Sequence, residues 1–447
     1  MFQNIPNNIK IIKLFIIFSF IVCWFSISTS FEDLLIFEND NILNFSNFIN
    51  FFRHLSVYIC FFFLILIFFA FNKKINFKKY IIFYILIGYF ISQVYGLFFS
   101  SNEIQNISFI ISSITTILTI ILIDNFFSKN EKKNFLILSF VILNVVFFLT
   151  FSPLFIKYLN GGSIYGGFIT SEALFNKVSP RSSGLARMAL IILILIEFFE
   201  LSYFKNYSKK IFFLKLVFLT FIFLFQSRTI IFLTILSYLI IFLNKNKITF
   251  KNFLKFTSLH ILIPITLFYL FSTLNSYQFT KRSYIIDDKE LSYIEHLNSD
   301  ELNIFRVMSE GDISSGRFSD WNEILNRISG KNIFYGFGAQ GDRYLIKQSA
   351  SNGLIYAYSS SGLIGLIFFI TFLIMVGLKT IKIFIYQFKK NIEEILHCII
   401  ISLLSLRTIL ETSYAVFGVD LILFTLALSF IFDNNIKVKD IKIKFFK

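Results

Sequence analysis

The chain has 447 residues, of which 56% are hydrophobic and 65 are phenylalanine, and its mean hydropathy is +0.72. This composition excludes a water-soluble globular protein and indicates a polytopic membrane protein. The net charge of +15 does not indicate a nucleic-acid partner, because the lysines lie in short clusters between apolar runs, as topology signals do.

Apolar segments with the length and composition of membrane-spanning helices follow one another along the chain. They are expected at 9–30, 55–72, 80–99, 107–125, 135–155, 185–203, 211–226, 229–243, 256–274, 353–377, 393–411 and 414–432. We therefore predict an all-α fold of about twelve transmembrane helices. The sequence shows no internal repeat and no separate soluble domain, so 1–447 is expected to form a single integral-membrane domain.

Lysine clusters predict the orientation of this bundle. With that number of spans, the clusters all fall on one side of the membrane, which the positive-inside rule identifies as the cytoplasm. They lie at 73–79, 129–133, 205–210, 245–251, 379–390 and 437–447. Both termini are then cytoplasmic, and the chemistry of the protein is expected on the opposite, periplasmic face.

The long outer loop, 275–352, is expected to be periplasmic and to contain short helices. Four of its residues follow the spacing i, i+3, i+4, i+7 of an amphipathic helix, namely Trp321, Ile324, Leu325 and Ile328. Ser319 or Ser315 is the expected N-cap of this helix, and Arg317 lies at its start. We expect the loop to act as a mobile lid that packs through the apolar face and carries Arg317 to a substrate.

Cysteine and histidine give no sign of a metal or cofactor site. Cys23, Cys60 and Cys398 lie in predicted spans, and the four histidines are scattered without ligand spacing. The string GFGAQG at 336–341 fits G-x-G-x-x-G, but it follows no predicted strand and opens no crossover helix. We interpret it as a turn and predict no disulfide, no metal and no cofactor.

Arginine is distributed differently from lysine. All of the arginines lie in predicted outer loops or near the outer ends of spans, while the cytoplasmic clusters contain lysine only. A guanidinium binds oxyanions through two parallel hydrogen bonds, which an ammonium cannot do. Either these arginines receive an anionic substrate, or they pair with nearby carboxylates and lipid headgroups.

Four arginines stand out by their position. Arg181 and Arg187 lie at the start of a predicted span, and a helix N-terminus favours anions. Arg228 lies in a turn between two closely spaced spans. Arg407 lies four residues before Glu411 on another span, an arrangement that fits either an ion pair or a substrate contact.

These residues lie in segments that resemble the O-antigen polymerase and O-antigen ligase superfamily. The matching segments are RSSGLARMAL (181–190), QSRTIIFLTIL (226–236), SGRFSDWNEILNRISGKNIFYGFGAQG (315–341), SNGLIYAYSSSGLIGL (351–366) and LRTILETSYAVFGVDLILF (406–424). Members of that superfamily are membrane glycosyltransferases that act on undecaprenyl-pyrophosphate-linked glycans at the periplasmic face of the bacterial inner membrane. Arg181 and Arg317 match the two loop arginines that the family uses on its substrates.

The resemblance implies an enzyme of lipopolysaccharide biosynthesis, and one difference favours a branch. The ligase branch has a His-Asn pair before the span that follows the long loop, whereas this chain has Ser351 and Asn352 there. An O-antigen polymerase is therefore favoured over an O-antigen ligase that transfers glycan to lipid A-core. The implied partners are undecaprenyl-pyrophosphate-linked glycans and membrane lipids, and a chain-length regulator protein remains open as a further partner.

The expected chemistry is displacement of a lipid pyrophosphate by a sugar hydroxyl, with fixed cations in place of a metal. Arg181 and Arg317 are the expected catalytic arginines, and Arg187, Arg228 and Arg407 are expected to bind substrate. Carboxylates on the outer side are the candidate proton acceptors, namely Glu411, Asp320, Glu323 and Glu172. Glu411 is taken with the catalytic arginines.

Two aromatic residues in and after the long loop are candidates for contact with a glycan. Trp321 and Tyr356 are expected to stack on sugars, with a role as interface anchors as the alternative.

A transporter such as a lipid-linked oligosaccharide flippase is the second hypothesis for the function, and a non-catalytic scaffold is the third. A transporter predicts charges near mid-span and related halves, whereas here charges concentrate at the outer ends of spans.

Overall fold

The computed structural model describes residues 7–27, 45–71, 78–99, 103–159, 182–202, 208–225, 227–245, 249–274, 317–346, 349–388 and 390–432, and every regular element in these ranges is a helix. Each predicted span overlaps a helix. The long helices are α1 (Asn7–Phe25), α2 (Phe45–Ala70), α3 (Ile81–Ser92), α4 (Glu103–Phe126), α5 (Lys129–Leu159), α7 (Ser182–Ser202), α8 (Ser208–Leu224), α9 (Arg228–Lys245), α11 (Ile263–Leu274), α17 (Gly353–Gln387), α18 (Ile392–Arg407) and α19 (Val419–Phe432). The predicted all-α fold is thus confirmed for the described residues.

Four described segments are long and apolar enough to cross a bilayer by themselves. They are Phe51–Ala70, Asn106–Phe126, Lys129–Ser152 and Gly353–Gln387. Other helices, among them α3, α9 and α19, are apolar but shorter. These helices make the chain a multi-pass membrane protein, and the larger number of spans stays a prediction.

Three predicted spans are interrupted in the structure. The 80–99 segment ends its α-helix at Ser92 and continues as the 3-10 turn η3 (Tyr95–Phe99). The 256–274 segment contains a π-helical turn, η5 (Ser258–Leu262), between α10 (Phe250–Thr257) and α11. The 414–432 segment begins with a 3-10 turn, η6 (Ser413–Ala415), because Ser413 has a φ of +44°, which no helix accommodates. Apolar composition alone does not report these backbone breaks.

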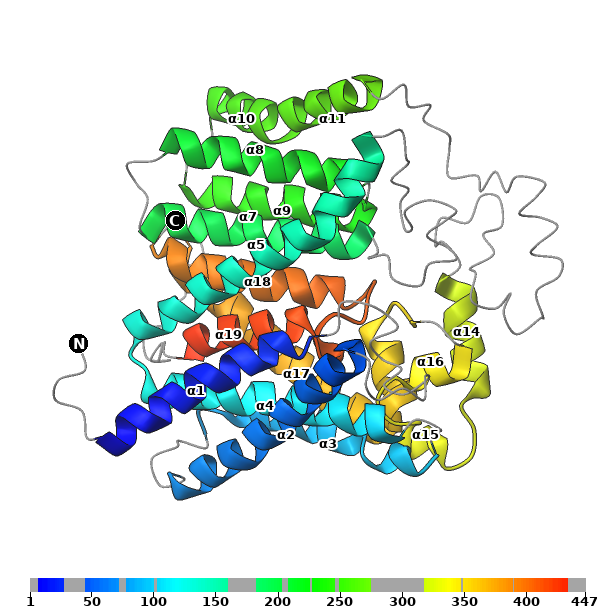
Figure 1. Cartoon of the computed structure of the whole chain (residues 1–447). Coiled ribbons are helices and arrows are strands. Elements are labelled where there is room, and N and C mark those ends of the chain that lie inside the picture. Colours follow the sequence, from blue (N-terminus) through cyan, green and yellow to red (C-terminus); the bar gives the residue numbers. More distant parts are fainter. Residues whose placement is uncertain are drawn as a thin grey trace, which may run out of the picture.

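The long helices form two flanks joined by a central pair (Figure 1). Helices α7, α8, α9 and α11 pack together on one flank, and α1, α2, α3, α4 and α17 pack on the other. Helix α18 contacts α7, α9 and α17, while α19 contacts α18 and α4. Every residue of α19 is buried, as expected for a helix that is apolar all round.

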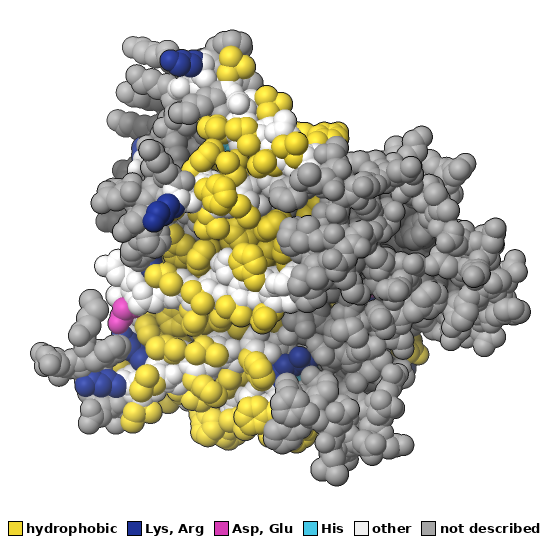
Figure 2. Space-filling model, turned by 45° about the horizontal axis from the view of Figure 1, so that its top comes forward, with side chains coloured by type: hydrophobic (Ala, Val, Ile, Leu, Met, Phe, Trp, Pro, Cys, Tyr) yellow, Lys and Arg dark blue, Asp and Glu magenta, His cyan; other side chains and the backbone are white. Residues whose placement is uncertain are grey.

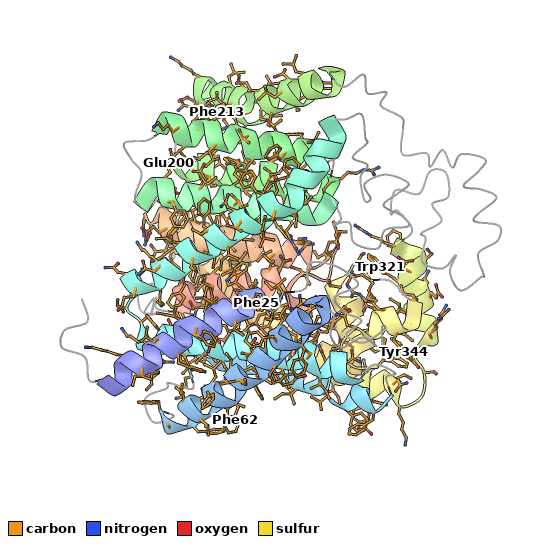
Figure 3. All side chains as sticks on the ribbon, viewed as in Figure 1. Phe25, Phe62, Glu200, Phe213, Trp321 and Tyr344 are labelled. Carbon is orange, nitrogen blue, oxygen red and sulfur yellow. The ribbon has the colours of Figure 1, made fainter. Side chains whose placement is uncertain are left out.

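Large apolar side chains cover the outside of the bundle. Figure 2 shows a continuous hydrophobic area across one face, with lysine and arginine side chains at its margins. Phe62 on α2 and Phe213 on α8 are 60% and 70% exposed and point outward (Figure 3). Such a surface would promote aggregation in water, and its natural environment is the lipid bilayer.

Ion pairs join the helices at one end of the bundle, here termed the lysine end. Lys79 and Lys132 each place Nζ 2.5 Å from the Asp124 carboxylate, which is fully buried. Lys133 pairs with Glu393 at 2.9 Å. Lys79 of the predicted 73–79 cluster and two lysines of the 129–133 cluster therefore share one end of the bundle, and which side of the membrane this end faces stays a prediction.

Helix α17 is broken near its start, and the Gly-rich turn fills the break. Gly362 has a φ of +61°, and a Cβ there would lie 2.2 Å from a backbone atom of the preceding loop, so only glycine fits. The Ser359 carbonyl, freed by the break, accepts a hydrogen bond from the Phe337 N–H at 2.8 Å. The interpretation of 336–341 as a turn is thus confirmed.

Three short helices from the predicted outer loop lie at the opposite end from the lysines: α14 (Arg317–Arg327), α15 (Asn332–Tyr335) and α16 (Gly341–Ile346) (Figure 1). They enclose a small core of their own. Its buried members are Ile324, Ile328, Phe337, Leu345, Ile346 and Ala350. Burial raises the pKa of Asp342 in α16, opposed by the neighbouring Arg343 and by the backbone N–H groups of Ala350 and Arg343.

The predicted amphipathic helix is correct in outline and wrong in two details. Ile324 and Ile328 are buried in the small core, whereas Leu325 is 43% exposed. Helix α14 begins at Arg317, so Ser319 lies inside it and is not the N-cap, and Ser315 lies outside the described residues. The apolar face packs on the loop's own core.

Candidate functional site

Two arginines and one aspartate meet inside the bundle, at the end opposite the lysines. Arg407, the last residue of α18, and Arg187, near the start of α7, both pair with Asp420 at the start of α19. Arg187 Nη1 lies 3.4 Å from Asp420 Oδ1, and Arg407 contacts Oδ2. Ser413 Oγ donates to the same Oδ2 at 3.0 Å. At 1.5 Å per residue, α18 separates Arg407 from Glu393 at the lysine end by roughly 20 Å.

We term Arg187, Arg407 and Asp420 the arginine cluster. The helix ends favour it, because a cation at a C-terminus and an anion at an N-terminus both complement the helix dipole. Asp420 is 1% exposed and Arg407 is 7% exposed, so their charges require partners within the protein. Two guanidiniums share one carboxylate, which leaves one net positive charge.

The cluster also keeps unused hydrogen-bond donors. The buried Nε atoms of Arg187 and Arg407 donate to no acceptor among the described residues. A guanidinium has five N–H donors, and a single carboxylate cannot satisfy those of two arginines. Buried donors without acceptors are costly, so the cluster is suited to receive a further anion.

A narrow pocket opens beside both arginines, between α7, α9 and α18. Its lining residues are Arg187, Leu190, Ile191, Ile194, Ile230, Leu233, Ile400, Leu403, Leu404 and Arg407. The walls are apolar, and the charged lining residues are the two arginines. The pocket is small, about 10 Å³ or room for one water molecule, so what it shows is that apolar walls and two guanidiniums meet at this place.

A second ion pair links the short loop helices to the bundle. Arg317 Nη2 on α14 lies 3.5 Å from Glu411 Oε1, and each side chain is 22% exposed. The Glu411 N–H donates to the Arg407 carbonyl at 2.8 Å, so Glu411 lies one turn beyond the arginine cluster. A partly exposed ion pair contributes little to stability, so both groups can exchange partners when a substrate arrives.

The structure separates two residues that the sequence placed on one helix. Helix α18 ends at Arg407, so Glu411 lies on the following turn, where Arg317 is its partner. The predicted alternative of an Arg407–Glu411 ion pair is wrong, because Arg407 pairs with Asp420. Of the predicted arginines, Arg181 lies outside the described residues.

Arg228 lies near the pocket without lining it. It is exposed at the first residue of α9, and Ile230, two residues further on, contributes to the pocket wall. The structure therefore brings Arg187, Arg407, Arg317 and Glu411 to one end of the bundle and leaves Arg228 at its margin.

The predicted aromatic residues pack within the protein. Trp321 is half-buried, and its Nε1 donates to the Ala350 carbonyl at 2.6 Å (Figure 3). Tyr356 is 2% exposed, and its hydroxyl accepts a hydrogen bond from the Gln340 N–H at 3.1 Å. Trp321 thus keeps part of its ring accessible, while the Tyr356 ring is enclosed.

The other candidate proton acceptors are placed less favourably than Glu411. Asp320 is buried within α14. Glu323 pairs with Arg327 on the exposed face of the same helix, Oε1 to Nη2, at 2.5 Å. Glu172 lies outside the described residues. Glu411 is the one of these carboxylates that the structure brings close to the arginine cluster.

Sequence reasoning missed the role of Asp420. The signal that could have found it is an ionisable residue in an otherwise apolar helix, because a carboxylate there requires a cationic partner. Its partners lie 13 and 233 positions away in the chain, and no spacing rule joins them. The described residues contain no group of three or more His, Cys, Asp or Glu side chains able to hold a metal ion.

Comparison with known families adds independent evidence. Residues 213–370 match the family model described as O-antigen ligase. This segment is a domain of the O-antigen ligase family. Proteins with this domain are membrane glycan-transferring enzymes of the ligase and polymerase type. No curated protein and no solved structure matches the chain.

The O-antigen ligase family domain covers part of the candidate site. It contains α9 of the pocket wall, Arg317 and the short loop helices, together with the first half of α17. Arg187, Arg407, Glu411 and Asp420 lie outside the matched segment. The structure therefore joins residues of the family domain to charged residues that the family match does not include.

Proposed function

We propose that the protein is an O-antigen polymerase that joins oligosaccharide repeat units carried on undecaprenyl pyrophosphate. The observation that carries the proposal is the pair of guanidiniums with spare buried donors where they meet the apolar walls of α7, α9 and α18, an arrangement suited to a molecule with an anionic head and an apolar chain. A polyisoprenyl pyrophosphate is an amphiphilic anion of this kind. The family domain at 213–370 supports glycan transfer as the reaction class.

Arg187 and Arg407 are proposed to bind the pyrophosphate. As the bond between the sugar and the pyrophosphate breaks, negative charge grows on the leaving oxygen, and fixed guanidiniums stabilise that charge without reorganising. Arg181, which precedes the same helix as Arg187, is proposed to add a further guanidinium. Arg228 at the margin of the pocket is proposed to contact the substrate as it enters.

Glu411 is proposed to accept the proton of the attacking sugar hydroxyl. The hydroxyl oxygen forms the new bond to the anomeric carbon, the bond to the pyrophosphate breaks, and the proton moves to the Glu411 carboxylate. Arg317 pairs with that carboxylate and is proposed to orient the glycan. Trp321, four residues from Arg317, is proposed to lie along the sugar chain, and Tyr356 to support the loop beneath it.

These roles require no metal ion, because the guanidiniums supply the charge neutralisation. The active face is proposed to be periplasmic and the enzyme to reside in the bacterial inner membrane, since the lysine end carries the charge bias of a cytoplasmic face. Neighbouring lipids are partners by necessity, and a chain-length regulator protein is proposed as a further one.

Two alternatives share the same pocket, and one experiment separates them. An O-antigen ligase would transfer glycan to lipid A-core, and a flippase would move the lipid-linked glycan across the membrane. The lipopolysaccharide of a deletion strain should show one repeat unit per core if a polymerase is lost. Complete loss of O-antigen would contradict the polymerase proposal and indicate a ligase or a flippase. Restoration of the ladder by the wild-type gene is the control.

A further inference from the structure

The start of α17 docks on the turn that follows α18, beside the candidate site. The Gly353 N–H donates to the Thr408 carbonyl at 2.7 Å, and Asn352 Nδ2 donates to the Ile409 carbonyl at 2.9 Å. Carbonyls at a helix C-terminus lack partners within the helix and need hydrogen-bond donors from elsewhere. The first residues of α17 thus close the end of α18 and anchor the turn that leads to Glu411.

Asn352 holds both sides of this junction with one side chain. Its Oδ1 accepts hydrogen bonds from the Leu354 and Ile355 N–H groups at 2.8 and 3.1 Å, which caps α17, while its Nδ2 reaches Ile409. The side chain is 8% exposed, so water competes little for these bonds. A carboxylate or a hydroxyl at this position would cap the helix equally well, but a carboxylate could not donate.

The anchored turn is exposed and strained. The Ile409 side chain is 55% exposed and contributes little buried area. Ser413 has a φ of +44°, in the left-handed region that residues with a side chain rarely adopt. The place of Glu411 therefore depends on the hydrogen bonds on either side of it. Asn352 donates to the Ile409 carbonyl before it, and Ser413 Oγ donates to the Leu404 carbonyl after it.

We propose that Asn352 is a positioning residue for Glu411. Its hydrogen bond to the Ile409 carbonyl sets the position of the Glu411 carboxylate against Arg317. Asn352 itself is not one of the residues proposed to bind substrate. The inference rests on the proposed function, in which Glu411 accepts the proton of the attacking hydroxyl. Arg407 is held separately by α18 and Asp420, so the loss of Asn352 affects turnover more than substrate binding.

The test uses Asn352→Ser and Asn352→Asp in the full-length protein, reconstituted in lipid. The substrate is the lipid-linked repeat unit extracted from membranes of a strain that lacks the enzyme. Both variants keep a good N-cap and lose the Nδ2 group that reaches Ile409, because aspartate has no donor and the serine side chain ends one atom earlier. We expect turnover to fall between about 10- and 100-fold, as for a misplaced catalytic group, with KM changed less than about twofold and an unchanged melting temperature.

A matched control comes from the lysine end. Asn391 caps α18 through its Oδ1, which accepts the Glu394 N–H at 3.5 Å, far from the arginine cluster. Asn391→Ser and Asn391→Asp should leave turnover and KM unchanged. An equal loss in the Asn391 variants, or a loss in the Asn352 variants that follows a lower melting temperature, would overturn the inference by showing a merely structural cap.

Glu411→Gln in the same assay separates the positioning role of Asn352 from the proposed role of Glu411 as proton acceptor. If Glu411→Gln loses turnover while both Asn352 variants retain it, the positioning role is overturned and the proposed function stands. If Glu411→Gln retains full turnover, Glu411 is not the proton acceptor, and both the proposed role and the inference built on it are wrong.

Discussion

Each end of the bundle neutralises a buried carboxylate, and the two ends use different cations to do so. At the lysine end Asp124 lies between Lys79 and Lys132, and at the other end Asp420 lies between Arg187 and Arg407. Each arrangement buries one carboxylate between two cations. The two ends differ in the hydrogen-bond donors that remain unused on their cations.

An ammonium is a compact charge, whereas a guanidinium is a planar fork with five donors. Lys79, in the turn before α3, and Lys132, on α5, both approach Asp124 on α4 to 2.5 Å. The arginines hold Asp420 and still have buried Nε donors without acceptors among the described residues, at the end of an apolar pocket. The lysine end therefore holds structural ion pairs, whereas the arginine end combines such ion pairs with a candidate anion-binding site.

The largest expected effect is on activity at the arginine end. Arg407→Lys keeps the charge and loses the fork, and two lost charge-assisted hydrogen bonds of about 1.5–3 kcal/mol each should lower polymer formation by roughly 100-fold or more. Glycan ladders normalised to membrane-inserted protein measure this. Lys132→Arg at the lysine end is the control and should leave activity per inserted molecule unchanged. Near-normal glycan ladders from Arg407→Lys would contradict bidentate binding of the pyrophosphate by Arg407.

Removing the shared carboxylate at each end should separate stability from function. Asp124→Asn and Asp420→Asn each leave one buried and one partly exposed cation without their anion, at a cost of about 3–5 kcal/mol. Thermal unfolding of the detergent-solubilised protein should show a loss in both variants. Activity per folded molecule should fall only for Asp420→Asn, and an equal fall for Asp124→Asn would contradict the division of roles between the two ends.

A smaller structural effect and a clear functional one are expected on α14. Arg317→Ala should abolish polymerisation with normal protein level, because its ion pair with Glu411 is partly exposed and contributes about 0–1 kcal/mol to stability. Arg327→Ala, ten residues along the same helix, removes an exposed pair with Glu323 and a hydrogen bond to the Leu345 carbonyl, and it should preserve activity per inserted molecule. Normal polymer length from Arg317→Ala would show that this arginine is only a surface charge.

The smallest expected effect is a pH dependence of the short loop helices. Because burial raises the pKa of Asp342 above the unfolded value of about 3.9, its contribution to stability is present below that value and is lost as pH rises through the folded-state pKa. The hydrogen-exchange protection factors of 341–346, which are corrected for the intrinsic base-catalysed rate, should therefore fall slightly across this interval. Asp342→Asn should remove the pH dependence, and an unchanged profile in that variant would exclude Asp342 as its source.

The described structure changes the picture of the outer loop as a mobile lid. Its α14–α16 part has a buried core, and the Gly-rich turn is hydrogen-bonded into the break of α17. Arg317 is already next to Glu411 without a further movement of that part. Motion of the loop as a lid stays a prediction, and the contacts described here favour a preformed site.

The sequence by itself determined the membrane class, the helical fold and the separation of lysine from arginine, because these depend on local composition and on the length of apolar runs. It also determined the face of α14 that buries Ile324 and Ile328, since the helical period is local. It did not determine where α18 ends or that Glu411 belongs to a turn, because those depend on the contacts of Asn352 and Gly353 with the Thr408–Ile409 backbone.

The tertiary structure alone decided that Arg187 and Arg407 share Asp420. Three helix ends distant in the chain meet there, and a buried charge selects its partner by proximity and desolvation, which leave no period in the sequence. The same packing formed the pocket between α7, α9 and α18, whose apolar walls look like ordinary membrane-spanning sequence. Residue type fixed what the arginines can bind, and packing fixed where an anion could meet them.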